Sequence, residues 1–207
     1  MARDTQSIVK MSRREGYALH PKAHKALAKR TSMPGQAANS RGMRNKPSQY
    51  SLQLREKQKV KRLYGLLEKQ FANLMAESSR KQGQSGEILL QLLERRLDNA
   101  IYRSGLAVSR RAARQLVTHG HFMMNGRRVD IPSIRLKAGD ELVLRDASKK
   151  NEYFKRIDDV SPASPDTVPA WLKVNRKKFE ISVTGIPTRE EAEPEINEQL
   201  IVEYYSR

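Results

Sequence analysis

Apolar residues recur at intervals of three and four between Val60 and Leu74, among positions that are otherwise mostly polar. This spacing puts the apolar side chains along one side of an amphipathic α-helix. We therefore predict a helix that begins near Ser51 and continues through this stretch. The sequence KQGQSG at residues 81–86 contains two glycines and should end it.

A second apolar series runs from Leu89 to Ile101 at the same spacing and predicts another helix, from about Glu87. This helix should end at Gly105, because glycine readily takes the left-handed conformation that closes a helix. Its leucine-rich run, ILLQLLERRL, is expected to pack within its own domain.

Local signals place a third helix and a hairpin after it. Ser109 precedes the helix predicted for residues 110–119, and its hydroxyl can accept a hydrogen bond from a first-turn amide. Two short strand-like runs then flank Asn125-Gly126, the dipeptide typical of a type I′ hairpin turn. A further strand is predicted at residues 141–145.

The sequence of the C-terminal part predicts a loop, short strands and a helix. Residues 158–169 are rich in Pro, Ser and Asp and predict a linker. Short strands anchored by Trp171 follow. Ile196, Leu200 and Tyr204 then recur at helical spacing, so we expect this segment to pack back on the first helical domain.

The first 50 residues show little periodicity apart from a short polar stretch at residues 21–29. Residues 32–49 mix prolines and glycines with cations and cannot build a core. Two interpretations are open: a disordered tail, or an extended arm that becomes ordered on a phosphate backbone. The concentration of charge in this part favours the arm.

The net charge of the chain indicates a polyanionic partner. Its 207 residues include 40 Lys and Arg against 23 Asp and Glu, a net charge of +17, and 16 of the basic residues fall within the first 62. Such a charge favours nucleic acid, because cations that neutralise phosphates release condensed counterions. Composition alone does not separate RNA from DNA or from an anionic membrane.

Other classes of site are excluded or disfavoured. With no cysteine, the chain has no disulfide, thiolate zinc site or cysteine nucleophile. No apolar run approaches the roughly 20 residues of a membrane span. The N-terminal residues lack the apolar core of a signal peptide. We expect a cytoplasmic protein with no membrane partner, although the translation compartment of an organelle stays open.

Cations gather on the third predicted helix. Arg110 and Arg114 are four residues apart and share a face, and Arg111 lies beside them. The N-terminal dipole of the helix adds attraction for a phosphate. The segment lacks the aromatic stripe that stacks single-stranded bases, so a folded RNA backbone is the expected ligand.

The candidate RNA-binding residues form two groups, and both are basic or amide-rich. The N-terminal group comprises Arg13, Arg14, Arg41, Arg44, Lys46, Lys57, Lys59, Lys61 and Arg62. The central group comprises Arg95, Arg96, Ser109, Arg110, Arg111, Arg114, Gln115, His119, Asn125, Arg127 and Arg128.

A resemblance to a known family lies in the central segment. The positions that carry it are Gly105, 109–110, 113–115, Val117, 120–121 and Val129, with Asn125-Gly126 between the last two. Their spacing resembles that of the small RNA-binding domain named after ribosomal protein four of the small subunit. That domain also occurs in several RNA enzymes.

Further motifs extend the resemblance over nearly the whole chain. PGQ at residues 34–36, REKQKVKRLYGLLEKQF at 55–71, RLDNAIYR at 96–103 and INEQLIVEYYS at 196–206 look like the bacterial-type S-four family of ribosomal proteins. They stand in the order that the family has.

The resemblance implies an α+β fold in three parts. A basic arm at residues 1–50 precedes a helical domain at 51–92, which the C-terminal segment at 160–207 completes. The small RNA-binding domain, two helices with a hairpin and strands, is inserted at 93–159. We expect no cofactor and no catalytic residue.

The resemblance also implies a function. The family binds the 5′ domain of small-subunit rRNA at a multi-helix junction and nucleates assembly. It lies where mRNA enters the subunit and contacts another small-subunit protein there, so Arg41, Arg44 and Lys46 are candidates for contacting mRNA. The resemblance further implies contributions to mRNA unwinding and translational accuracy, and some relatives repress translation of their own operon.

A metal site is not expected. Many members of the family carry a zinc-binding cysteine cluster near the N-terminus, but Val9 and Ser12 stand where the first cysteines would fall. His20 and His24 are four residues apart, yet Pro21 lies between them and no further ligand is near. Solvated or phosphate-facing imidazoles are the better interpretation.

Two features of the chain suggest alternatives to a ribosomal protein. Arg96-Leu97-Asp98 matches a short motif of pseudouridine synthases, but it sits in a patterned helix, where Arg95 and Asp98 can pair, and no room is left for a catalytic domain. A structural or RNA-contacting role for His119 and His121 is likewise preferred to catalysis. A stand-alone basic RNA chaperone would explain the charge but not the end-to-end resemblance.

Overall fold

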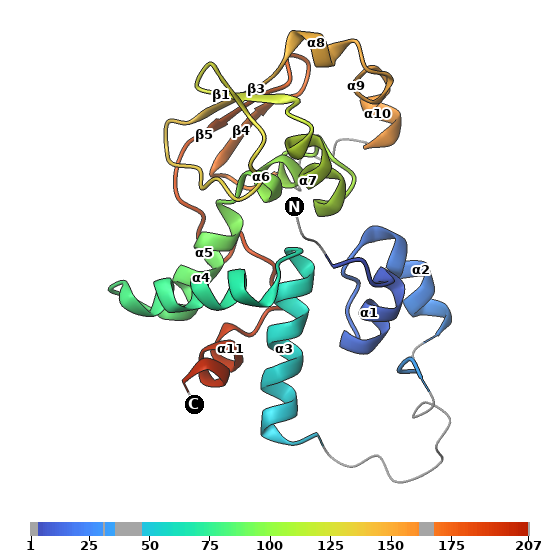
Figure 1. Cartoon of the computed structure of the whole chain (residues 1–207), viewed down its shortest axis with the longest axis vertical. Helices are drawn as coiled ribbons and strands as arrows, with labels where there is room; N and C mark the ends of the chain where they lie inside the picture. Colours follow the sequence, from blue (N-terminus) through green and yellow to red (C-terminus); the bar gives the residue numbers. More distant parts are fainter. Residues whose placement is uncertain (1–3, 31, 36–46, 162–167, 207) are drawn as a thin grey trace. The chain divides into compact units, whose positions relative to one another are not determined.

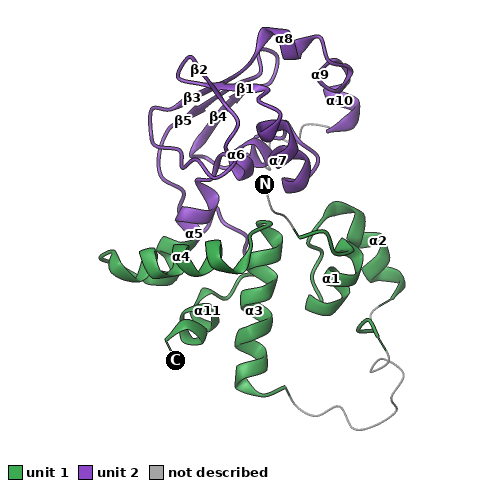
Figure 2. Cartoon of the chain, in the orientation of Figure 1, with its two compact units in different colours: residues 1–89, 195–207 green, residues 90–194 purple. Residues whose placement is uncertain are grey.

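Helices dominate one part of the chain and a small antiparallel sheet lies in the other, which confirms the predicted α+β class (Figure 1). The computed structural model describes residues 4–30, 32–35, 47–161 and 168–206. The candidates Arg41, Arg44 and Lys46 lie outside these residues. Two compact units result: unit 1 is Met1–Leu89 with Glu195–Arg207, and unit 2 is Leu90–Pro194 (Figure 2).

Unit 1 is helical. The polar stretch noted at residues 21–29 is a helix, and another helix, missed from the sequence, precedes it and buries little more than Met11 and Ser12. The helices are α1 (Ile8–Glu15), α2 (Pro21–Lys29), α3 (Gln49–Leu63), α4 (Glu68–Arg80) and α11 (Glu198–Tyr205), and α5 (Ser85–Glu94) continues into unit 2.

The single helix predicted through Leu74 is in fact two helices. α3 ends at Leu63, and Gly65, at φ 66°, takes the left-handed conformation that glycine adopts without strain. Leu66 N–H then donates to the carbonyl of Lys61, 2.9 Å away. The apolar spacing identified the buried residues correctly, but it could not show the corner between them.

α11 packs against α3, as its apolar spacing predicted. Ile201 is fully buried, and the Gln53 side chain donates to Glu203, 2.8 Å away. Tyr50 stacks on Tyr204 with ring centroids 5.9 Å apart. The C-terminal helix is therefore part of the core of unit 1.

Glu68 joins three helices of unit 1. Its carboxylate accepts hydrogen bonds from Lys57 Nζ at 2.7 Å, Lys61 Nζ at 2.8 Å and the Tyr205 hydroxyl at 3.0 Å. Burial by itself would raise the pKa of Glu68, but these hydrogen bonds lower it to about 2. The carboxylate thus holds α3 and α11 to the start of α4.

Unit 1 should lose stability in acid because of this carboxylate. A carboxyl whose pKa is lower in the folded state stabilises the fold above its unfolded pKa, here 4.5, and stops doing so as pH falls towards 2. The contribution is modest, since the side chain is half exposed. We expect Glu68→Gln to reduce the dependence of the thermal unfolding midpoint of unit 1 on pH. Circular dichroism between pH 6 and 2 measures this dependence as a slope. Glu77→Gln, on the same helix, should retain the wild-type slope; equal slopes for both variants would contradict the assignment.

Unit 2 surrounds a five-stranded antiparallel sheet in the order β2-β1-β3-β5-β4. Its helices are α6 (Leu97–Arg103), α7 (Arg110–Thr118), α8 (Asp146–Lys149), α9 (Glu152–Lys155) and α10 (Ile157–Val160). Its strands are β1 (Phe122–Met124), β2 (Arg127–Val129), β3 (Glu141–Leu144), β4 (Leu172–Asn175) and β5 (Glu180–Val183).

The predicted cap and hairpin are confirmed. Ser109 Oγ accepts from the amide of Ala112 at 3.2 Å and starts α7. Asn125 and Gly126 have φ values of 49° and 78°, the positive angles that a type I′ turn needs. Phe122, on β1 beside this turn, is fully buried in the core of unit 2.

The helix predicted from Glu87 to Gly105 is divided at Arg96. The backbone of Arg96 forms a bridge with Arg135, and Leu97 N–H donates to the carbonyl of Ile134 at 2.9 Å. Pairing with this distant segment draws the backbone out of helical geometry between α5 and α6.

Residues that the sequence grouped with the helical domain lie in unit 2. β5 pairs with β3, with Leu142 opposite Ile181, and β4 pairs with β5. Trp171 and Val183 are buried in the same core as Phe122. The small domain therefore extends beyond residue 159, because a strand pairing between distant segments decides its limits. Among the described residues, no helix combines the length and apolar character that crossing a bilayer requires.

Candidate nucleic-acid interface

The central candidate cations fall into two classes, those paired with carboxylates inside unit 2 and those without such a partner. The first class includes Arg96, Arg110 and Arg114. The second includes Arg111, Arg127 and Arg128, which are exposed and have no ion pair among the described residues.

Asp98 holds two of the candidate arginines. Arg96 donates two hydrogen bonds to it from one edge of the guanidinium, Nε to Oδ1 at 3.0 Å and Nη2 to Oδ2 at 2.7 Å. Arg114 Nη1 reaches Oδ2 at 3.4 Å. Arg96 and Asp98 are both buried. The predicted pairing of Arg95 with Asp98 is wrong, because Arg95 Nε donates to the carbonyl of Leu136 instead.

Burial also affects Arg114. It lowers the pKa of the guanidinium, the charge of Asp98 opposes that change, and the charge of Arg96 adds to it. The side chain is 15% exposed. Arg114 is thus placed mainly to pair with Asp98.

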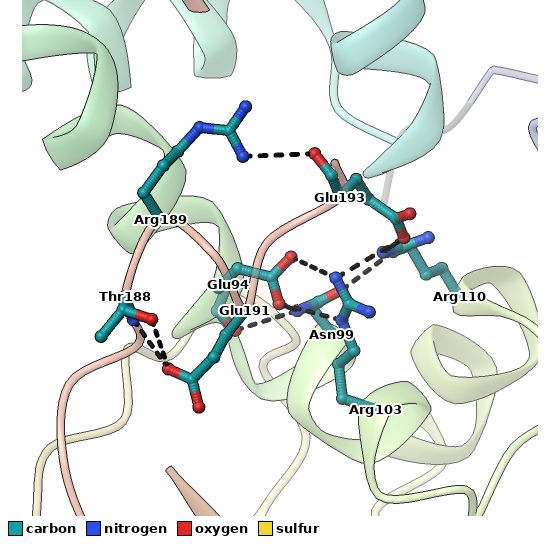
Figure 3. A network of polar contacts seen from close by, with 8 residues as sticks. All are labelled: Glu94, Asn99, Arg103, Arg110, Thr188, Arg189, Glu191 and Glu193. Atoms are coloured by element: carbon teal, nitrogen blue, oxygen red, sulfur yellow. Dashed lines mark hydrogen bonds and ion pairs between the residues drawn. The ribbon is translucent and has the colours of Figure 1, made fainter. Parts of the chain in front are cut away.

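Glu94 is the centre of a second network (Figure 3). Its fully buried carboxylate accepts from Asn99 Nδ2 at 2.7 Å and from Arg103 Nε and Nη2 at 3.1 and 3.0 Å. A buried charge needs this many partners, because an unpaired one is strongly destabilising. The network fixes α6 to the end of α5.

Arg110 extends this network to the segment after β5. Its Nε donates to Asn99 Oδ1 at 2.8 Å and its Nη2 donates to Glu193 at 2.7 Å (Figure 3). The guanidinium carbon lies 4.5 Å from the centroid of the Tyr102 ring. Arg110 therefore joins α7 to two other parts of unit 2, and much of its charge is balanced by Glu193.

Other central candidates are also used within the fold. Ser109 caps α7, and Asn125 fixes the hairpin, with Nδ2 donating to Asp140 and Oδ1 accepting from the amide of Glu141, both at 2.9 Å. Gln115 and His119 are exposed on α7 and directly after it.

All five basic residues of α3 pair with carboxylates. Lys57 is buried and pairs with Glu68, and Lys61 pairs with the same carboxylate. Lys59 Nζ lies 2.8 Å from Glu56 and 2.7 Å from the carbonyl of residue 195. The structure therefore gives these lysines a role in holding unit 1 together.

Glu15 ties α1 to α3. Its side chain is fully buried and pairs with Arg62, and with Arg55 at 3.2 Å. Burial raises the pKa of Glu15, while the charges of Arg55, Arg62 and Arg14 act against that rise. The remaining carboxylate oxygen, Oε2, has no hydrogen-bond partner among the described residues.

The other N-terminal candidates lie on the two short helices or next to them. Arg13 Nη2 donates to the carbonyl of Ser32 at 2.9 Å, and Arg14 is exposed. His20 Nδ1 accepts from the amide of Lys22 and caps α2. His24 is exposed. No group of three metal-ligating side chains occurs within the ranges that the structure describes.

Sequence reasoning missed the acidic partners and one cation. Glu94, Glu193 and Glu15 carry no local signal, because their arginines come from other helices. Arg145 was seen only as the end of a strand, yet its Nη1 donates to the carbonyl of Gly120 at 3.1 Å. A basic residue at the end of a predicted strand beside a basic hairpin was the one signal available.

Comparisons with known proteins agree with this arrangement. The family model "Ribosomal protein S4/S9 N-terminal domain" matches residues 3–94, and the model "S4 domain" matches residues 95–142. Together they cover α1 to α7 and the β1–β2 hairpin.

Relatives extend the match to the whole chain. Small ribosomal subunit protein uS4A of Symbiobacterium thermophilum is 46% identical over 213 residues, and uS4 of Herpetosiphon aurantiacus is 46% identical over 211. The uS4 protein of Clostridioides difficile is 47% identical over 213 residues. Each alignment spans 100% of this chain and 100% of the relative. The resemblance stated from the motifs is thereby confirmed.

Proposed function

Because the chain belongs to the small ribosomal subunit protein uS4 family, we infer that it is a structural constituent of the small ribosomal subunit that binds rRNA through its S4 domain. The observation that carries this role is the division among the basic side chains of unit 2. Arg96, Arg110 and Arg114 are paired internally and shape the domain. Arg111, Arg127 and Arg128 are exposed without a carboxylate, so they are available to phosphates.

The ligand proposed is folded rRNA rather than a single strand. Phe122, Phe154 and Trp171 are buried in unit 2, and Tyr102 lies under Arg110. Within the described part of unit 2, no stacking platform of exposed aromatic rings remains for unpaired bases. Recognition therefore rests on backbone phosphates and shape, which suits a junction of RNA helices.

The finer part of the proposal follows the family. The chain is a primary rRNA-binding protein that nucleates assembly of the 5′ domain, at a multi-helix junction, in the cytoplasm. It lies near the site where mRNA enters, contacts another small-subunit protein, and contributes to mRNA unwinding, translational accuracy and repression of its own synthesis. Support comes from the charge: 16 of the first 62 residues are basic, Arg41, Arg44 and Lys46 among them.

A competition titration tests the rRNA site. We expect the full chain to bind a labelled 5′-domain fragment of small-subunit rRNA in the presence of excess tRNA at moderate salt, because the site recognises a defined fold as well as charge. Fluorescence anisotropy over a salt series gives the affinity for each RNA. If affinity for both RNAs falls equally as salt rises, the proposal fails and a non-specific RNA chaperone is the better description.

A further inference from the structure

Two guanidinium groups meet at Gly120, where α7 ends. Gly120 has φ 68°, and a Cβ added there would lie within 3.0 Å of the guanidinium of Arg128. Arg145, directly after β3, donates from Nη1 to the Gly120 carbonyl at 3.1 Å. The absence of a side chain at this position therefore lets Arg128 lie directly against the backbone.

Two histidines flank the same glycine. The rings of His119 and His121 have centroids 6.0 Å apart. Nδ1 of His121 is 2.9 Å from Ser148 Oγ on α8. The His121 ring also makes a T-shaped contact with Phe154 on α9, with centroids 5.6 Å apart. Nε2 of His121 has no hydrogen-bond partner among the described residues. We call His119, His121, Arg128 and Arg145 the Gly120 cluster.

The cluster is positive and has no internal counter-charge. No ion pair involves any of its four side chains in the part of the chain that the structure describes, and the nearby Asp146 is bonded to Lys149 at 2.7 Å. This contrasts with Arg96, Arg110 and Arg114, each of which has a carboxylate. The last carbonyl groups of α7 offset only part of the charge.

The charges that face His121 all have the same sign. Burial lowers the pKa of His121, and the charges of His119 and Arg145 lower it further. Ser148 and Phe154, which also contact the ring, carry no charge. The imidazole is thus held towards its neutral form until an anion arrives.

We propose that the Gly120 cluster binds one backbone phosphate of the RNA and that His121 takes up a proton when the phosphate binds. This inference rests on the proposed rRNA-binding function and assigns part of the contact. Arg128 and Arg145 are the charge-assisted donors. The phosphate favours the imidazolium form of His121, so the bound state holds more protons than the free state.

Proton uptake makes RNA affinity depend on pH. The affinity gained by protonating His121 is present at low pH and is lost as pH rises through the pKa of His121 in the complex. A difference of one pKa unit between bound and free states corresponds to about a tenfold change in affinity. The structure assigns this dependence to His121, and the exposed His24 on α2 serves as the matched control.

The test measures affinity of the full chain for the 5′-domain fragment between pH 5.5 and 8.0 at constant ionic strength. Wild-type affinity should fall about tenfold over this range. His121→Gln should remove most of the fall, and His24→Gln should leave it unchanged. Arg128→Gln should weaken both the salt dependence and the pH dependence, whereas Arg111→Gln should weaken the salt dependence alone.

An NMR titration of the His121 ring in the wild-type chain provides a readout that needs no variant. Bound rRNA fragment should raise the pKa of His121, and inorganic phosphate at the same ionic strength should raise it less. An equal rise with inorganic phosphate would overturn the assignment to RNA.

The same measurements distinguish a missing phosphate site from a missing rRNA-binding role. Tight, tRNA-resistant binding that is independent of pH, with an unchanged His121 titration, overturns the phosphate site and leaves the rRNA-binding role intact. Loss of discrimination against tRNA overturns the rRNA role itself.

Discussion

Replacing Asp98 by alanine is expected to lower the free energy of unfolding of unit 2 by about 3–5 kcal/mol, because the buried Arg96 guanidinium loses its counter-charge. Arg114 and the amide of Asn99 lose an acceptor at the same time. Denaturant unfolding followed by the fluorescence of Trp171 measures the change, because this one tryptophan of the chain is buried in the core of unit 2.

A matched control separates this effect from loss of surface charge. Asp158 also pairs with an arginine, Arg176, at 2.9 Å, but the carboxylate is 85% exposed. Asp158→Ala should therefore change stability far less than Asp98→Ala. Similar losses for the two variants would mean that the buried pair does not hold unit 2 together.

Removing Arg111, Arg127 and Arg128 together, each replaced by glutamine, should weaken binding to the 5′-domain rRNA fragment by about 1000-fold or more. Hydrogen bonds to charged groups contribute about 1.5–3 kcal/mol each, and about 1.4 kcal/mol corresponds to a tenfold change in affinity. The slope of log affinity against log salt should fall by about three units, one for each lost phosphate contact. Trp171 fluorescence should show unchanged stability, because all three side chains are exposed.

Three exposed lysines in the same unit provide the control. Replacing Lys173, Lys177 and Lys178 by glutamine changes the net charge equally, at β4 and the turn after it. If this variant loses as much affinity and slope as the arginine variant, the binding follows total charge and the assigned surface is wrong. A larger loss for the arginine variant supports the surface.

Signals confined to a few residues predicted structure well in this chain. Ser109 as a cap and Asn125-Gly126 as a turn depend only on neighbouring backbone groups, and both are as expected. The corner at Gly65 and the break at Arg96 were missed, because the apolar spacing continues across them. At Arg96 the backbone is drawn away by a partner near residue 135, which no local pattern reveals.

In the candidate interface, too, local signals did not show which basic side chains are paired with carboxylates. The sequence located the basic residues, but it gave Arg110 and Arg114 a phosphate-facing role on helix spacing alone. The carboxylate of Glu193 lies 83 residues from Arg110 in the sequence and 2.7 Å from it in space. Spacing along a helix indicates which side chains share a face, and only the tertiary fold shows which of them are already neutralised.

Unit 1 combines residues from both ends of the chain, so it cannot be completed until α11 has been synthesised. α11 leaves the ribosome after every residue of unit 2, although its partner α3 precedes that unit. Glu203, the hydrogen-bond partner of Gln53, is therefore synthesised 150 residues after it. Unit 2 has all its strands and helices before then, so we expect it to fold first, because domains generally fold as units during synthesis. Until α11 arrives, the nascent chain exposes the side of Phe71 that Tyr205 later covers, and that interval is when unit 1 is open to aggregation or to a chaperone.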